Sequence, residues 1–188
     1  MKMKQVAVAG LIALSAIGAH AAAVTAQVGA QSTTDFLLTG SNVSGGQLLL
    51  DGIPNVAAMP QDTTAGTYFL AGEPGDHGGS ATVTFMDGVS SVSFDWGSPD
   101  GWNTLLVTLS DSSTAAFSAS QLGLGSGYSY VDFSAAGGLS IKSLTFEATQ
   151  PAFEAANFKV SVVPEPANVA LLLAGLGMVG LMARRRRA

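Results

Sequence analysis

Side chains that carry oxygen atoms surround a turn near the middle of the chain. Asp95 precedes the segment Ser98-Pro99-Asp100-Gly101, and Asn103 follows it. Carboxylate and amide oxygens are hard ligands of the kind that Ca²⁺ takes, so Asp95, Asp100 and Asn103 are candidate calcium ligands. Neither an EF-hand loop nor a Gly/Asp nonapeptide repeat accompanies them. The alternative is that these side chains cap the turn, and in that case we expect no cofactor.

Two tryptophans flank the same turn. Trp96 continues an alternating apolar pattern with Val92 and Phe94, which places its side chain in the core. Trp102 lies outside that pattern, and an exposed indole can stack on a sugar ring or anchor an interface. Packing of Trp102 into the core, as a plug for the loop, is the alternative. The turn is therefore a candidate ligand-binding site, for polysaccharide or for calcium.

Few residues of the chain are suited to catalysis. Beyond the first 21 residues the chain holds one histidine, His77, and it holds no cysteine anywhere. A single histidine excludes a multi-histidine metal site, and zero cysteines exclude disulfides and cysteine catalysis. No Gly-x-Ser-x-Gly segment presents a serine nucleophile. Paired carboxylates of a glycosidase kind are formally available, but most acids stand beside glycine or at strand edges, as turn-forming aspartate does. We therefore expect no catalytic residues and no enzyme.

The elements that position these residues are short strands. Apolar and polar side chains alternate with a period of two, which indicates half-buried strands, and Gly, Pro and Asp clusters such as Asp87-Gly88 mark turns between them. About ten short strands with no convincing helix predict an all-β domain, a β-sandwich or jelly roll. Residues 24–33 carry no pattern and suggest a disordered arm or an edge strand. The predicted strands are residues 81–85, 92–96, 105–109 and 158–162, with further candidates at 34–39, 46–50, 67–71, 114–119, 128–134 and 139–147.

The charges divide the chain into three parts. Only 11% of the 188 residues are charged, against about 25% in ordinary soluble domains. Residues 24–163 hold 12 acidic and two basic residues, whereas the two ends are apolar and basic, so a net charge of −5 hides a middle part of −10. An acidic middle part excludes a nucleic-acid binder, which needs a basic face.

The N-terminal segment has the layout of a secretory signal peptide. Lys2 and Lys4 form a basic region, residues 6–17 form an apolar run, and Ala19 and Ala21 occupy the −3 and −1 positions of a cleavage site. The apolar run is shorter than the roughly 20 residues of a membrane span. We expect cleavage after Ala21, with Ala23 and Ala26 as alternatives. The predicted partners are the Sec translocon and signal peptidase.

The C-terminal segment predicts a membrane anchor. Pro164-Glu165-Pro166 forms a stiff, extended peptide because both prolines fix φ and restrict the residue before them. Residues 167–183 are almost entirely apolar and make a helix of roughly 25 Å, at the short end of the transmembrane range. The cluster Arg184, Arg185, Arg186 and Arg187 stays cytoplasmic. The chain thus divides into residues 1–21, a signal peptide; 22–163, an exported β-sandwich domain; and 164–188, an anchor.

The Pro-Glu-Pro segment, the short apolar helix and the terminal arginines together resemble the PEP-CTERM sorting signal. The resemblance implies a Gram-negative source and recognition by an exosortase, a membrane cysteine protease. It implies cleavage near Pro164-Glu165-Pro166, so that the chain is anchored transiently in the inner membrane and then reaches the cell surface or the medium. Such substrates accompany exopolysaccharide and biofilm formation.

A second resemblance covers roughly residues 90–163. The segment from Phe94 to Leu105, which reads Phe-Asp-Trp-Gly-Ser-Pro-Asp-Gly-Trp-Asn-Thr-Leu, resembles a motif of the Npun family of exosortase-dependent surface proteins. Residues 153–157 resemble the closing Phe-Glu-x-Asp-Asn segment of that family. Ala156 stands where those proteins carry an acid, so any role of that acid is not carried over. The resemblance implies a β-sandwich and no established chemistry.

These observations predict a non-enzymatic, exosortase-processed surface or matrix protein with a structural or adhesive role linked to exopolysaccharide. A carbohydrate-binding module, with or without calcium, is the alternative, and a hydrolase is a third and less favoured interpretation.

Overall fold

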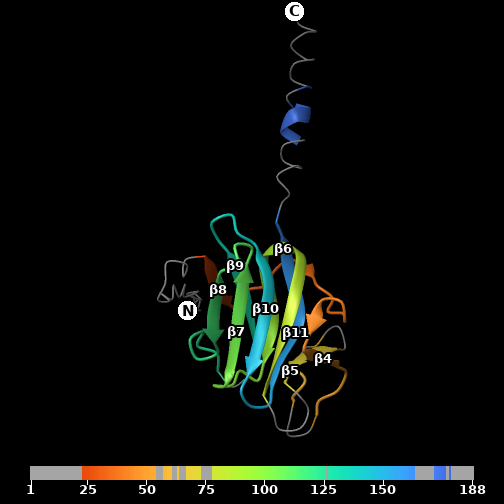
Figure 1. The fold of residues 1–188 in the computed structure, drawn as a ribbon, viewed down its shortest axis with the longest axis vertical. Coiled ribbons are helices and arrows are strands. Elements are labelled where there is room, and N and C mark those ends of the chain that lie inside the picture. The colour runs from red at the N-terminus through yellow and green to blue at the C-terminus, as the bar shows by residue number, and fades with distance from the viewer. Residues whose placement is uncertain are drawn as a thin grey trace, which may run out of the picture.

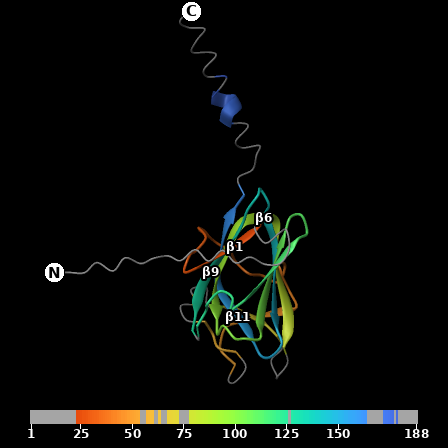
Figure 2. The ribbon, with the colours of Figure 1, turned by 90° about the vertical axis from the view of Figure 1, so that its left-hand side faces the viewer.

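The computed structural model describes residues 23–53, 57–60, 63, 67–72, 78–125, 127–163, 172–176 and 178. The predicted signal peptide with its cleavage site, His77, Pro164-Glu165-Pro166 and the arginine cluster at 184–187 lie outside these residues. Figures 1 and 2 show the described residues between 23 and 163 as a body of strands, and residues 172–176 as a short helix.

The described residues form an all-β fold, as predicted. Every pair of neighbouring strands among them is antiparallel. The strands are β1 (Val24–Val28), β2 (Thr34–Asp35), β3 (Val43–Ser44), β4 (Gly46–Leu49), β5 (Tyr68–Ala71), β6 (Gly79–Gly97), β7 (Asn103–Leu109), β8 (Thr114–Ser118), β9 (Ser129–Ala135), β10 (Ile141–Ala148) and β11 (Phe153–Val162).

The long strand β6 belongs to two layers. Its first half pairs with β10, which continues through β7 to β8, and also with the short β3. Its second half pairs with β11 on one side and β9 on the other. That layer continues from β11 through β5 to β4 and from β9 to β1. The two layers face each other as a β-sandwich, which is visible when Figures 1 and 2 are compared.

The predicted turn at Asp87-Gly88 is wrong, because β6 runs through it without reversing. The register with β10 jumps from Thr84–Ser143 to Val89–Ile141 at this point, so β6 bulges where it passes from one layer to the other. Gly88 has a φ of +72°, and a Cβ there would lie 2.5 Å from the Ser140 Oγ atom. The local turn signal thus produces a bulge rather than a hairpin.

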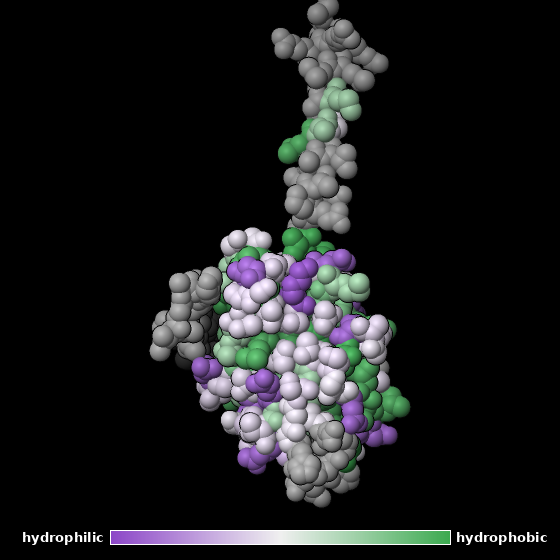
Figure 3. All heavy atoms as spheres, in the orientation of Figure 1, coloured by the Kyte–Doolittle hydropathy of each residue, from purple (hydrophilic) through white to green (hydrophobic). Residues whose placement is uncertain are grey.

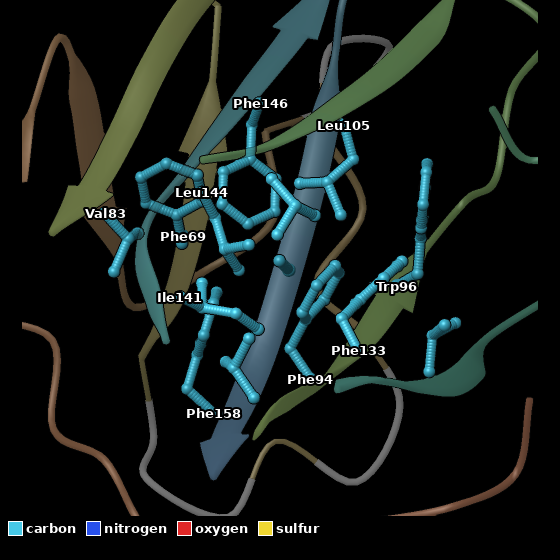
Figure 4. Packing of buried hydrophobic residues seen from close by; sticks show 14 of the residues in the cluster. Phe69, Val83, Phe94, Trp96, Leu105, Phe133, Ile141, Leu144, Phe146 and Phe158 are labelled. Carbon is cyan, nitrogen blue, oxygen red and sulfur yellow. The ribbon is translucent and has the colours of Figure 1, made fainter. Parts of the chain in front are cut away.

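Aromatic side chains fill the space between the layers. The Phe94 ring of β6 lies 5.3 Å from the Phe146 ring of β10 and 5.3 Å from the Phe158 ring of β11. Figure 4 shows these rings converging from different strands, with Leu105 and Leu144 beside them. This contact across the sandwich removes large apolar faces from water, which is the main favourable term in folding.

Two further expectations are adjusted at the strand ends. Of the predicted strand 34–39, residues 34–35 alone are strand, while the segment 24–33, which carries no pattern, contains the edge strand β1.

Within the described part of the chain, no helix has both the length and the apolar character needed to cross a membrane. Residues 172–176 form a helical turn, and the rest of the predicted helix 167–183, apart from residue 178, lies outside that part.

Candidate functional site

The two segments that resemble the Npun proteins lie side by side. Strand β11 pairs with the end of β6, so that Glu154 faces Gly97, Ala155 faces Trp96 and Ala156 faces Asp95. In the sequence, 47 residues separate these two segments. Together with the turn that follows Gly97, they form the candidate site.

Trp96 is a core residue, as predicted. Its side chain is completely buried, and its ring stacks on the Phe153 ring with 4.4 Å between centroids. Phe153 in turn meets Phe146 of the opposite layer in an edge-to-face contact at 4.9 Å. The second aromatic residue of one motif segment, Trp96, therefore packs directly against Phe153, the first residue of the other.

Trp102 packs against the core, which is the alternative to an exposed position. Its side chain is half-buried against the main hydrophobic core, with the indole nitrogen shielded from water. Its carbonyl oxygen accepts a hydrogen bond of 3.3 Å from the Thr149 amide, which ties the turn to the end of β10. The ring therefore packs against the core, and a stacking role for Trp102 on a sugar stays a prediction.

The three predicted calcium ligands occupy different environments. The Asn103 side chain is fully buried on the core face of β7, and its Nδ2 donates to the Ser98 carbonyl at 3.4 Å, which caps the turn. Asp95 lies on the opposite face of β6 from Trp96, and Asp100 stands on the turn itself, half-buried. Among the described residues, no three Asp, Glu, His or Cys side chains are grouped as metal ligands. The calcium site therefore stays a prediction.

Glu154 is the titratable residue of this region that sequence analysis did not single out. Its side chain is 2% exposed, and its Oε1 accepts a hydrogen bond of 3.0 Å from the Ala58 amide. Its Oε2 is buried with no hydrogen-bond partner within the described part of the chain. Desolvation raises the pKa of this carboxyl to about 7, the negative charge of Asp100 adds to the rise, and the Ala58 bond opposes it.

A small second core covers Glu154 on the outer face of the β11 layer. Tyr68 donates a hydrogen bond of 3.1 Å to the Asp51 carbonyl. Burial, followed by the negative charge of Glu154, raises the pKa of the Tyr68 hydroxyl. Ala156 packs in this cluster, so the position where the Npun proteins carry an acid is apolar here. The cluster consists of Ala57, Tyr68, Leu70, Ala152 and Ala156, with Leu49 and Ile53 against it.

Asn157 closes the second motif segment with a bulge. Its φ is +54°, in the left-handed region that Asn tolerates better than most residues. The register of β11 against β6 shifts here, from Ala156 opposite Asp95 to Lys159 opposite Ser93. The bulge divides the outer edge of β11, because β5 pairs with residues 153–155 and β2 pairs with residues 159–160.

A groove lies where β5 and β2 diverge along this edge of β11. Its volume is about 340 Å³. Polar and apolar side chains both line it, and the Lys159 Nζ and Asp35 Oδ1 atoms, 3.6 Å apart, form an ion pair there. The residues that line it are Asp35, Phe36, Leu37, Leu38, Leu48, Thr67, Phe69, Ala155, Ala156, Asn157, Phe158 and Lys159. The groove could not be predicted from the sequence, because its position depends on which strands pair with β11.

In a comparison with known proteins, the C-terminal end of the chain matches a family model. Residues 162–187 match the PEP-CTERM protein-sorting motif. The resemblance to the Npun family is not confirmed and stays a prediction. No curated protein and no solved structure matches the chain. The matched residues begin at Val162, where β11 ends, so the motif follows the last strand of the sandwich directly. The chain thus carries a PEP-CTERM sorting motif after its sandwich, and this motif indicates an exported protein that is anchored transiently in the membrane before exosortase processing.

Proposed function

We propose that the processed chain is a non-enzymatic component of the cell surface or extracellular matrix, with a structural or adhesive role beside exopolysaccharide. The sorting motif at residues 162–187 is the observation that carries the proposal. A chain that is sorted in this way acts outside the inner membrane. Its partners on this route are the Sec translocon, signal peptidase and the exosortase, and it binds no nucleic acid.

The position of the motif supports release of an intact domain. Strand β11 ends at Val162, and Pro164 follows after one residue. Cleavage near Pro164-Glu165-Pro166 would leave the whole of β11, and with it the contacts of β11 with β5 and β6, in the released protein.

The use of polar residues near the turn supports a non-enzymatic role. Asn103 caps the turn, and Glu154 holds the Ala58 amide. Both side chains are almost completely withdrawn from solvent, whereas a general acid or base must reach its substrate. The Asn103 Nδ2 and Glu154 Oε1 atoms thus make structural hydrogen bonds, which supports a structural role for both residues.

The experiment is a complementation of the deleted gene in the native bacterium. The wild-type chain is compared with a variant in which Pro164, Glu165 and Pro166 are all replaced by alanine. We expect the wild type to restore matrix cohesion and the variant to leave the protein in the membrane fraction without restoring it. Full restoration by the variant would show that sorting is irrelevant to the function. Release of reducing ends from the strain's own polysaccharide by the purified protein would instead favour the hydrolase.

A further inference from the structure

The groove at the Asn157 bulge has the lining of a small-ligand site. Pockets for small ligands are concave and largely apolar, with a few polar groups that fix orientation, and their volumes start at about 300 Å³. The groove, at about 340 Å³, fits this description at the lower limit. It is therefore large enough for a single ring or two but not for an extended ligand.

One end of the groove is polar. The Lys159 ammonium supplies donors, the Asp35 carboxylate supplies acceptors, and the Asn157 amide supplies both. The ion pair between Lys159 and Asp35 is open to water, with Asp35 92% exposed. Exposed pairs stabilise a fold by about 1 kcal/mol or less, so both side chains can change partner at little cost. These groups match a ligand that carries adjacent hydroxyls.

The walls of the groove are apolar. Leu37 is 69% exposed and Leu48 is 36% exposed, and Phe36 supplies an aromatic side chain that also contacts the Phe85 ring at 5.0 Å. Figure 3 shows green, hydrophobic residues gathered at the right-hand edge of the molecule, on the side where Figure 1 places β4. Apolar walls beside hydrogen-bonding groups suit a pyranose ring, which has C–H faces and a hydroxyl rim.

The charge of the domain decides between neutral and anionic sugars. Residues 24–163 carry a net charge of −10, and the one basic residue of the groove is already beside a carboxylate. A polyanion would be repelled by such a field. An acyl chain, for its part, offers no hydroxyl groups to the ammonium, carboxylate and amide that line the groove.

From this geometry we infer that the groove binds one or two hexopyranose units of an uncharged polysaccharide. The inference rests on the proposed function, because it names the material that the exported chain would meet outside the cell. It also places the sugar site at the groove beside Asn157 rather than at Trp102, whose side chain is half-buried against the main core.

Two variants remove polar groups of the groove while keeping the fold. Asn157→Gly deletes the amide and retains the positive φ of the bulge, which glycine adopts freely. Lys159→Met deletes the ammonium and keeps a chain of similar length. Lys142→Met is the matched control, because Lys142 lies on β10 in the other layer and donates to the Met86 carbonyl.

The measurement is isothermal titration of the purified full-length chain with dextran, mannan and hydroxyethyl cellulose as neutral probes, alginate as the anionic probe and dodecanoate as the apolar probe. We expect saturable binding of at least one neutral polymer, at least fivefold weakened in Asn157→Gly and Lys159→Met and unchanged in Lys142→Met. Binding that the groove variants do not weaken, a preference for alginate or dodecanoate, or no binding of the neutral probes would overturn the inference.

Failure of this inference is distinguishable from failure of the proposed function. Both groove variants leave residues 164–188 unchanged, so sorting is read separately by cell fractionation of the same strains. A chain that is sorted but binds no neutral polymer refutes the groove alone. A chain that binds but stays unsorted refutes the proposed function and leaves the groove in place.

Discussion

Among single residues, the buried carboxyl of Glu154 makes the free energy of unfolding depend on pH. A carboxyl whose pKa rises on folding stabilises the folded state when it is protonated, and that contribution is lost as the pH rises through the folded pKa. For Glu154 the ordinary value is 4.5 and the folded value is about 7. The stabilisation is therefore complete below pH 4.5 and disappears between pH 4.5 and pH 7.

We predict that Glu154→Gln removes this dependence. A glutamine keeps an oxygen for the Ala58 amide but carries no charge, so the variant is more stable than the wild type at pH 8, by about 3 kcal/mol at most. Urea unfolding at pH 5 and pH 8 measures the effect, with Glu147→Gln on β10 as the control. An equal pH dependence in the wild type and in Glu154→Gln would refute the buried-charge interpretation.

A second prediction at the residue scale concerns the left-handed conformation of Asn157. A β-branched residue is strongly disfavoured at a φ of +54°, whereas glycine is not. We expect Asn157→Val to lower the free energy of unfolding by about 1–3 kcal/mol and Asn157→Gly to change it by less than about 1 kcal/mol. Thermal unfolding of both variants tests this order, and the reverse order would show that the side chain of Asn157 matters more than its backbone.

At the scale of elements, the β6 bulge depends on Gly88. Gly88→Ala adds both a strained φ and a contact with Ser140, whereas Gly137, with a φ of +66°, has open space around it. We expect Gly137→Ala to cost about 1 kcal/mol from the backbone alone and Gly88→Ala to cost clearly more. Denaturant unfolding compares the two variants. Equal costs would mean that the crossing point of β6 yields to the added methyl group.

Strand β1 narrows the choice of signal-peptide cleavage site. Val24 is buried in the main core, and the Ala23 carbonyl accepts a hydrogen bond of 2.8 Å from the Ala136 amide. Cleavage after Ala26 would remove Val24, and cleavage after Ala23 would remove that carbonyl. We therefore predict a mature chain that begins at Ala22, which N-terminal sequencing can establish. A start at Gln27 would show that the first half of β1 is dispensable.

The strands that sequence analysis predicts well are those with their own alternating pattern. Strand β7, at Asn103–Leu109, buries every second side chain from Asn103 onward, so residues 105–109 already indicate it. Strand β1 has no such pattern, since its pairing with β9 holds it in place. The sequence also does not predict that β6 is one continuous strand, because the turn signal at Asp87-Gly88 fits a hairpin as well as a bulge.

The candidate site follows the same division. The segment Ser98-Pro99-Asp100-Gly101 predicts the turn after Trp96, and the alternation of Trp96 with Phe94 predicts its position in the core. The burial of Glu154 and the groove at Asn157 could not be predicted from the sequence, because both arise from contacts of β11 with segments far away in the chain. Long-range pairing of this kind leaves no local pattern.

At the scale of the whole molecule, the chain combines an export route with a sandwich that ends where the sorting motif begins. The few basic residues between the two ends leave the exported part strongly acidic, which favours neutral partners over polyanions. The aromatic contacts between the layers do not involve the matched residues 162–187, so the sandwich can keep its core after the tail is removed.

The central claim is that an exosortase processes this chain near Pro164-Glu165-Pro166. Intact-mass spectrometry of the protein recovered from the native bacterium tests it most directly, with an exosortase-deficient strain as the reference. We expect a mature chain that starts at Ala22 and has lost the arginine cluster and the apolar segment before it, and a longer chain that retains them in the deficient strain. The same uncut mass in both strains, with residues 184–187 still present, would contradict it.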